Sequence, residues 1–271
     1  MFEPLPVRNL CLTIAYDGTD YLGWQKTKEG PSIEAELQHT LEQILQHPVS
    51  LQAASRTDAG VHAEAQVVNF FTPHAKDLDR LQKSLNGLLS PAISVTDIAE
   101  MPTAFHPTLD CSGKEYHYHL CLGSFQLPQY RHYSWHYPYP LDVGAMQKAA
   151  PFLQGYHDFS AFTCEPQEDN HREVFSIEIE PISTHRLQIR VSGNRFLYKM
   201  VRSIVGTLVY VGCGKIEMQK LPSILASQDR KQAGVTAPAH GLTLKKVLYT
   251  CRETTLVGAE AAISGKNATT L

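Results

Sequence analysis

The sequence predicts an α+β protein made of two ferredoxin-like halves, each with the element order β-α-β-β-α-β. Segments that alternate between apolar and polar residues are interleaved with segments of helical period, and the same order of elements occurs twice along the 271 residues. With 43% hydrophobic and 19% charged residues, the chain has the composition of a globular protein with a large core. We expect the two antiparallel sheets to lie side by side, with a central cleft across them.

The N-terminal half is expected to cover residues 1–104. Residues 8–16 alternate and are rich in β-formers, which predicts a strand. Ser32 is a suitable N-cap for a helix in which Ile33, Leu37, Leu41, Ile44 and Leu45 share one face. The later elements of this half are expected, in order, as strands at 49–56 and 65–71, a helix at 77–89 and a strand at 93–99.

The C-terminal half is expected to cover residues 105–251 and to repeat this order. Its predicted elements are a strand at 114–122, a helix at 141–153, a strand pair at 173–181 and 185–192, a helix at 196–211 and a strand at 245–250. The repeat is one of element order and not of sequence. Residues 252–271 are small and polar, and we expect them to form a flexible tail.

Composition also restricts location and partners. No apolar run approaches the roughly 18 residues of a membrane span, and the first ten residues have an early acid and two prolines, unlike a signal peptide. The six cysteines form no C-x-x-C pair, which favours reduced thiols in the cytoplasm. The net charge of −3 counts against a general nucleic-acid coat, so an RNA partner would require Lys and Arg to be clustered in space.

The segment 55–63 (SRTDAGVHA) is the first candidate for chemistry, because it brings Arg56, Asp58 and His62 together between two predicted strands. A tight turn at Ala59-Gly60 would let the acid point out of the sheet into a cleft. The alternative is that Asp58 only caps the turn and pairs with Arg56 on the surface.

The segment 193–212 is the second candidate. If a helix starts at Gly193-Asn194, then Arg195, Lys199 and Arg202 lie on the side opposite its apolar residues, where they would suit RNA phosphates. No acid occurs between 192 and 215 to neutralise this stripe. The alternative is an ordinary solvated helix face.

The third candidate is the strand at 114–122. Tyr116 and Tyr118 share one face and His117 and His119 share the other. The tyrosines could stack on bases, or could pack in the core. The histidines have no third ligand at a recognisable spacing, so no metal site is predicted.

At these residues the sequence resembles the TruA-type tRNA pseudouridine synthases, which modify uridines 38–40 in the anticodon stem-loop. Motifs similar to those of the family stand in the same order at 16–25 (YDGTDYLGWQ), 56–63 (RTDAGVHA), 105–106 (FH), 114–118 (KEYHY), 157–162 (HDFSAF), 196–202 (FLYKMVR) and 239–244 (AHGLTL).

The resemblance implies a role for several residues. Asp58 would be the essential catalytic carboxylate, and Arg202 would pair with it. Tyr116 would stack on the target base and is a possible proton acceptor, while Arg56 would take part in base flipping and RNA binding. Members of the family act as homodimers, whose shared basic clefts would reconcile an acidic chain with a tRNA substrate. Arg195 and Lys199 are further candidates for substrate binding.

The sequence departs from the family pattern at Ser55, Thr108, Glu115 and Thr243. A glycine is common at the first position, an arginine at the second, a basic residue at the third and an aromatic residue at the fourth. These departures predict weaker or differently distributed tRNA contacts and unchanged chemistry.

The isomerisation itself needs no cofactor and no metal, because uridine and pseudouridine contain the same atoms. A carboxylate beside C1′ could stabilise positive charge there, add to C1′, or remove the 2′ proton. Two other functions stay open at this point. One is a tRNA-binding or folding module without catalysis, and the other is a hydrolase that uses Asp58 and His62.

Overall fold

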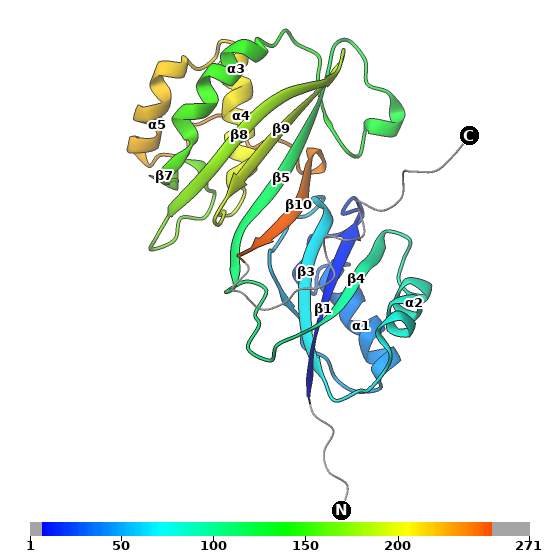
Figure 1. Cartoon of the computed structure of the whole chain (residues 1–271). Helices are drawn as coiled ribbons and strands as arrows, with labels where there is room; N and C mark the ends of the chain where they lie inside the picture. Colours follow the sequence, from blue (N-terminus) through cyan, green and yellow to red (C-terminus); the bar gives the residue numbers. More distant parts are fainter. Residues whose placement is uncertain (1–6, 251–271) are drawn as a thin grey trace, which may run out of the picture.

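A single ten-stranded sheet runs through the computed structural model, which describes residues 7–250 (Figure 1). The strand order is β4-β1-β3-β10-β5-β9-β8-β7, with β2 added beside β3 and β6 beside β5. Neighbouring strands are antiparallel except for the pairs β3–β10 and β5–β6. The α+β class and the two ferredoxin-like halves are therefore as predicted.

The N-terminal half contains every element that its pattern predicts. They are β1 (Arg8–Tyr16), α1 (Ile33–Leu45), β2 (Gln52–Ala53), β3 (His62–Thr72), α2 (Leu78–Leu88) and β4 (Ile93–Met101). The Ser32 hydroxyl accepts a hydrogen bond from the backbone N–H of Ala35, so the predicted N-cap is present. The apolar face of α1 is buried against the sheet.

The strand predicted at 49–56 is much shorter in the structure, since only Gln52 and Ala53 pair with β3. Beyond them the chain leaves the ladder, because the Gln66 side chain takes the place of a strand partner. Its Oε1 accepts from the Ser55 N–H at 3.2 Å and its Nε2 donates to the Ser55 carbonyl at 2.6 Å. The segment 55–61 is thereby released from the sheet as a loop.

The C-terminal half repeats the order of the first. Its main elements are β5 (Cys111–Leu122), α3 (Val143–Ala149), β8 (His171–Ser183), β9 (Arg186–Gly193), α4 (Met200–Gly212) and β10 (Leu242–Tyr249). A 3₁₀ turn, η2 (Ala150–Leu153), extends α3 to the end of the predicted helix. Elements that no pattern predicted are β6 (Trp135–Tyr137), β7 (Gly155–Asp158), α5 (Leu221–Ser227) and the 3₁₀ turns η1 (Pro128–Tyr130), η3 (Ser160–Phe162), η4 (Met218–Lys220) and η5 (Ala239–Gly241).

The helix predicted at 196–211 begins four residues late, which corrects a central expectation. Gly193 is the last residue of β9, and Lys199 adopts a left-handed backbone with φ of 58°, so α4 starts at Met200. Arg195 and Lys199 therefore do not lie on the helix, and the three-cation stripe along it was wrong. All of α4 except Arg202 and Tyr210 is buried, so the helix is a core element with almost no polar face.

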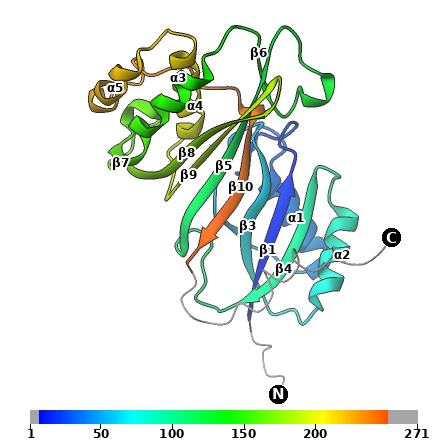
Figure 2. The ribbon, with the colours of Figure 1, turned by 45° about the horizontal axis from the view of Figure 1, so that its top comes forward.

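The two halves meet where β10, from the end of the chain, lies beside β3 (Figure 2). Only two residue pairs make this junction, Thr243 with His62 and Leu244 with Ala63. The helices α1 and α2 cover the sheet of the first half, and α3, α4 and α5 cover that of the second (Figures 1 and 2). The sheets are thus continuous, which is a closer connection than lying side by side.

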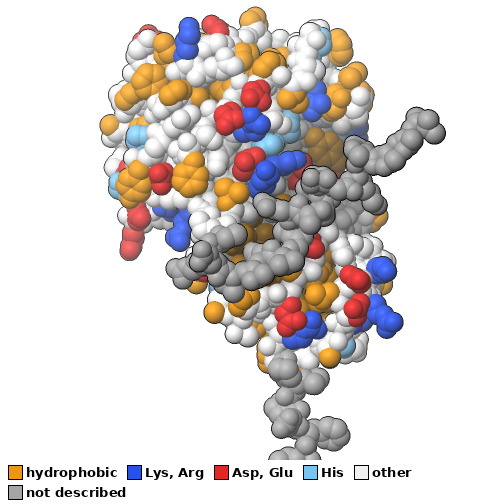
Figure 3. Space-filling view, viewed as in Figure 1, with side chains coloured by type: hydrophobic (Ala, Val, Ile, Leu, Met, Phe, Trp, Pro, Cys, Tyr) orange, Lys and Arg blue, Asp and Glu red, His pale blue; other side chains and the backbone are white. Residues whose placement is uncertain are grey.

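Figure 3 shows acidic and basic side chains intermingled on one face of the molecule. On the sheet itself, Arg190 of β9 pairs with Glu178 and Glu180 of β8, and Lys245 of β10 pairs with Glu64 of β3. Because these cations have acidic partners in the protein, they are poor candidates for binding phosphate. The concentrated positive charge that RNA requires has to be sought elsewhere.

Two further expectations concern membrane-spanning segments and the state of the cysteines. No helix among residues 7–250 is long and apolar enough to cross a membrane. The five cysteines within the described range are free thiols. The predicted tail at 252–271 lies outside the described residues.

Candidate active site

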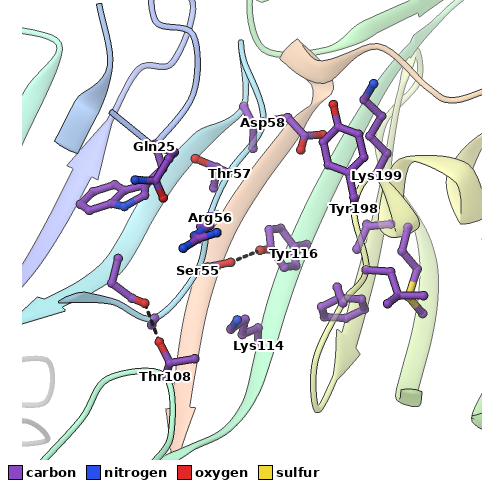
Figure 4. A pocket seen from close by; sticks show the side chains of 18 of the residues that line it. Gln25, Ser55, Arg56, Thr57, Asp58, Thr108, Lys114, Tyr116, Tyr198 and Lys199 are labelled. Carbon is purple, nitrogen blue, oxygen red and sulfur yellow. Dashed lines mark hydrogen bonds between the residues drawn. The ribbon is translucent and has the colours of Figure 1, made fainter. Parts of the chain in front are cut away.

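A cavity of about 680 Å³ opens where the two halves meet (Figure 4). One wall comes from the loop that follows β2 and the other from β5 and the residues that lead into α4. Asp58 and Arg202 line it together with Arg56, Tyr116 and Lys199. Residues from distant parts of the sequence therefore line one concave, half-open cavity, which is the usual form of a ligand site.

The loop that carries Asp58 is held in place by hydrogen bonds to the motif at 16–25. The Thr57 carbonyl accepts a hydrogen bond from the Trp24 N–H at 3.0 Å. The Thr57 hydroxyl lies 2.8 Å from the Tyr16 hydroxyl. The Val61 N–H closes the turn by donating to the Asp58 carbonyl at 3.1 Å. The Asp58 carboxylate is thus held on a tight turn and 17% of its side-chain surface stays exposed.

Gly23 allows this loop to approach so closely. Its backbone is left-handed, with φ of 92°, and a Cβ at this position would lie 2.5 Å from the Thr57 carbonyl oxygen. Only glycine satisfies both conditions. The motif at 16–25 therefore supports the loop at 55–61, although the two are some 30 residues apart in the sequence.

Arg202 forms the ion pair that orients Asp58. Its terminal nitrogen lies 2.7 Å from Asp58 Oδ2, and its Nε donates to the Ala237 carbonyl, also at 2.7 Å. The two bonds use the fork of the guanidinium group and fix its plane. The alternative in which Asp58 pairs with Arg56 on the surface is not what the structure shows.

Tyr116 points into the cavity from β5 and is almost completely buried. Its hydroxyl lies 2.8 Å from the Ser55 hydroxyl, and the Phe196 ring packs edge-on against it at 5.4 Å between centroids. Burial, reinforced by the negative charge of Asp58, raises the pKa of Tyr116 to about 12. The hydroxyl is therefore protonated at neutral pH.

Tyr118 and the two histidines of β5 have other roles. Tyr118 is fully buried, donates to the Pro238 carbonyl and does not line the cavity, so the core alternative holds for it. His117 pairs with Glu115, and His119 lies 2.9 Å from the Gln188 amide. Burial lowers the pKa of His119 to about 4.

His62 is buried below the loop and is not among the residues that line the cavity. Its Nδ1 accepts from the Gly18 N–H at 3.1 Å and lies at the same distance from Asp17 Oδ1. Its Nε2 contacts the carbonyls of His132 and His240, at 2.8 and 3.2 Å. Both nitrogens are occupied in joining chain segments, which disfavours the hydrolase that would use His62 beside Asp58.

Comparison with known proteins identifies the family. A family model described as "tRNA pseudouridine synthase" matches residues 12–109 and 149–250. The chain belongs to this family. Its members convert uridine to pseudouridine in tRNA, so the chain is an isomerase.

Individual relatives agree with this assignment. The chain is 55% identical to "tRNA pseudouridine synthase A 2" of Protochlamydia amoebophila (strain UWE25), over 90% of this chain and 95% of that protein. It is 43% identical to "tRNA pseudouridine synthase A" of Myxococcus xanthus, over 89% and 91% of the two chains. A solved chain in "Crystal Structure of a Cbf5-Nop10-Gar1 Complex" is 14% identical with a TM-score of 0.37, covering 87% of this chain and 48% of that one. The present chain thus spans about half the length of that solved chain.

Of the three remaining cations proposed for tRNA binding, two line the cavity and one does not. Arg56 is exposed and lines the cavity. Lys199 also lines it, with Nζ 4.5 Å from the centroid of the Tyr198 ring. Arg195 lies in the connection between β9 and α4 and is not among the lining residues. RNA binding by each of them stays a prediction.

The departures from the family pattern have definite positions. Ser55 holds the Tyr116 hydroxyl, and the Thr108 hydroxyl donates to the Ala53 carbonyl at 2.7 Å on the cavity wall. Glu115 pairs with His117, and Thr243 takes part in the junction with β3. Two of the four therefore contribute contacts within the cavity of this synthase.

Sequence reasoning missed the cavity residues Lys114, Phe196 and Tyr198 as separate contributors. Alternation along β5 puts Lys114 on the same face as Tyr116, which was a usable signal. Phe196 and Tyr198 were assigned to a helix that begins only after them, so their position could not be derived from the helical period.

Proposed function

We propose that the chain isomerises uridine to pseudouridine at positions 38, 39 and 40 in the anticodon stem-loop of tRNA, with Asp58 as the essential carboxylate. The observation that carries the proposal is the Asp58–Arg202 ion pair in a cavity that Tyr116 also lines. The relatives named "tRNA pseudouridine synthase A" support the class of substrate. The resemblance of the motifs supports the three positions.

The proposed site lies between an N-terminal half, residues 1–104, that supplies Asp58 and a C-terminal half, residues 105–251, that supplies Tyr116 and Arg202. The target uridine leaves its stack and enters the cavity, which costs a few kcal/mol. Stacking on Tyr116 returns about 1–3 kcal/mol of this cost. Arg56, exposed at the cavity, is suited to fill the vacated position in the RNA.

The chemistry conserves every atom of the nucleotide. The C1′–N1 bond breaks, the uracil turns, and C5 bonds to C1′; C5 then loses one proton and N1 gains one. The Asp58 carboxylate acts at the sugar, where positive charge develops as the bond breaks. Arg202 orients it through a charge-assisted bond. No group is oxidised, so the reaction requires no cofactor and no metal.

Tyr116 is the proposed acceptor of the C5 proton. Because its hydroxyl is protonated at neutral pH, it can accept that proton only as its own leaves. The Ser55 hydroxyl, 2.8 Å away, can take the departing proton as it releases its own proton to water. Ser55, which replaces the usual glycine, would thus take part in the step without altering its outcome.

We further propose that the enzyme works in the cytoplasm as a homodimer whose two subunits contribute to each tRNA-binding cleft. The support is the family resemblance together with the net charge of −3, which requires positive charge to be gathered locally. Within the described range, Arg56 and Lys199 supply part of that charge at the cavity.

The Asp58→Asn variant tests the function. We expect it to retain tRNA binding and to lose pseudouridine formation by at least about a thousandfold, because the amide cannot supply the negative charge. The measurement is mapping of pseudouridine in bulk tRNA from a strain that lacks the enzyme, before and after adding the pure protein. Asp79→Asn, an exposed substitution on α2, is the matched control and should be fully active.

The same experiment separates the alternatives. Clear turnover by Asp58→Asn would overturn the assignment of the carboxylate. A wild-type protein that binds tRNA and modifies nothing would support the non-catalytic tRNA-binding module. Full formation of pseudouridine in the presence of a chelator would count against a metal-dependent hydrolase.

A further inference from the structure

Lys114 lies on β5 two residues before Tyr116, so the two side chains leave the same face of the strand. Both line the cavity, and Figure 4 shows them next to each other on the wall that faces Arg56. Residues two apart on a strand are separated by about 6.6–6.8 Å. Neither the ion pair at Asp58 nor the stacking role of Tyr116 involves this lysine.

No hydrogen bond or ion pair joins the Lys114 ammonium group to another residue within 7–250, in contrast to Lys245, which pairs with Glu64. Burial is the main cause of the lowered pKa of Lys114; the interaction with Cys111 raises this pKa, and the positive charge of Arg195 lowers it. The acid Glu34 also lines the cavity, but its carboxylate is already bound to Gln25 and to the Lys26 N–H. Asp58 and Glu165 line the cavity as well, but Asp58 pairs with Arg202 and Glu165 forms no ion pair with Lys114. A partly buried ammonium group without an acidic partner at ion-pair distance is unfavourable in the empty protein.

We propose that Lys114 binds the phosphate of the flipped target nucleotide while Tyr116 holds its base. This inference rests on the proposed function, because it requires an RNA strand in the cavity. A phosphate supplies the full negative charge that the site lacks, whereas a uracil carbonyl supplies only a dipole. The spacing of the two side chains along β5 is comparable with the distance from base to phosphate within one nucleotide.

The affinity of the protein for unmodified tRNA, measured as a function of salt between 50 and 200 mM, tests the proposal. Removing one phosphate contact lowers the slope of log Kobs against log[salt] by about 0.7–0.9. We expect Lys114→Gln to show this loss and to bind roughly tenfold more weakly at the lowest salt. Lys114→Arg should restore both values, because it returns the charge. Lys148→Gln, on the exposed side of α3, is the control and should leave the slope unchanged.

Single-turnover kinetics with saturating enzyme complete the test. A salt slope of Lys114→Gln equal to that of the wild type would overturn the phosphate contact. If the slope is unchanged and only the single-turnover rate falls, Lys114 contacts the base instead. Thermal unfolding of both Lys114 variants distinguishes a binding effect from a folding defect. The salt slope requires no turnover, so a wild-type protein that binds but does not modify tRNA would refute the proposed function and leave this measurement valid.

Discussion

At the scale of single residues, the cavity is organised by two hydrogen bonds between the halves. One joins Asp58 to Arg202 and the other joins Ser55 to Tyr116. In both cases a residue of the loop at 55–61 meets a side chain from the C-terminal half. The positions of the acid and of the aromatic ring are therefore set relative to each other, which reaction geometry requires.

The Tyr116→Phe variant separates stacking from proton transfer. We expect it to bind tRNA normally, because the ring remains, and to form pseudouridine at least tenfold more slowly, because the hydroxyl is missing. Loss of the bond to Ser55 should cost about 0.5–1.5 kcal/mol of folding stability. Single-turnover assays and urea unfolding measure the two effects.

Ser55→Ala is the companion to that variant, since it removes the same hydrogen bond and keeps the Tyr116 hydroxyl. A moderate loss of rate in Ser55→Ala and a larger one in Tyr116→Phe would agree with the proposed proton route. An unchanged single-turnover rate in Tyr116→Phe would exclude the hydroxyl from the reaction.

At the scale of elements, the turn that carries Asp58 depends on the segment between β1 and α1. Gly18 and Gly23 in this segment lie against the backbone of Val61 and Thr57. The loop at 55–61 is therefore packed against another loop and is not held by the strands alone. Such support is what keeps a site on a loop precise.

Gly23→Ala should disturb this support. The left-handed backbone alone costs a non-glycine residue about 1–2 kcal/mol, and the clash with the Thr57 carbonyl adds to it. We expect reduced stability in urea unfolding and a loss of turnover larger than the loss of tRNA affinity, because the Asp58 loop moves. Gly87→Ala is the control; it lies within α2 with open space around it and should stabilise the protein by about 0.5–1 kcal/mol. Normal turnover in Gly23→Ala would show that the loop is positioned by other contacts.

Helix α4 shows where sequence periodicity misleads. Its apolar period extends into residues 196–199, and this predicted a helix that included them. The left-handed backbone at Lys199 makes α4 begin only at Met200, and Phe196 and Lys199 line the cavity instead of forming a helical turn. A local φ angle that tertiary contacts impose leaves no trace in the apolar period.

At the scale of the whole molecule, the halves are joined by a short stretch of parallel pairing between β3 and β10 and by the contacts of His62. The His62 side chain links Gly18 of the first half to the carbonyls of His132 and His240 of the second. Because Nδ1 accepts from the Gly18 N–H, Nε2 carries the proton and donates. The histidine thus stabilises the junction between the two halves next to the loop that carries Asp58.

His62→Ala tests this junction. Removing the buried ring leaves the Gly18 N–H and the carbonyls without partners, so we expect a loss of about 1–3 kcal/mol in urea unfolding. Turnover should also fall, although His62 does not line the cavity, because the halves would no longer hold Asp58 and Tyr116 in register. His39→Ala, exposed on α1, is the control and should be neutral in both measurements. Unchanged stability in His62→Ala would show that the sheet pairing and the other contacts between the halves suffice without His62.

The sequence by itself predicted the element order of the two ferredoxin-like halves and selected Asp58, Tyr116 and Arg202 as candidate site residues. The reason is that alternation, helical period and short ordered motifs are local properties of the chain. Only the tertiary structure decided which cations reach the cavity, because this depends on contacts between distant segments. It removed Arg195 from the lining, moved the start of α4 to Met200, added Lys114 to the lining and joined Ser55 to Tyr116 by a hydrogen bond. The junction of β3 with β10 brings the two halves together and pairs residues some 180 positions apart. No local sequence pattern predicts such a pairing.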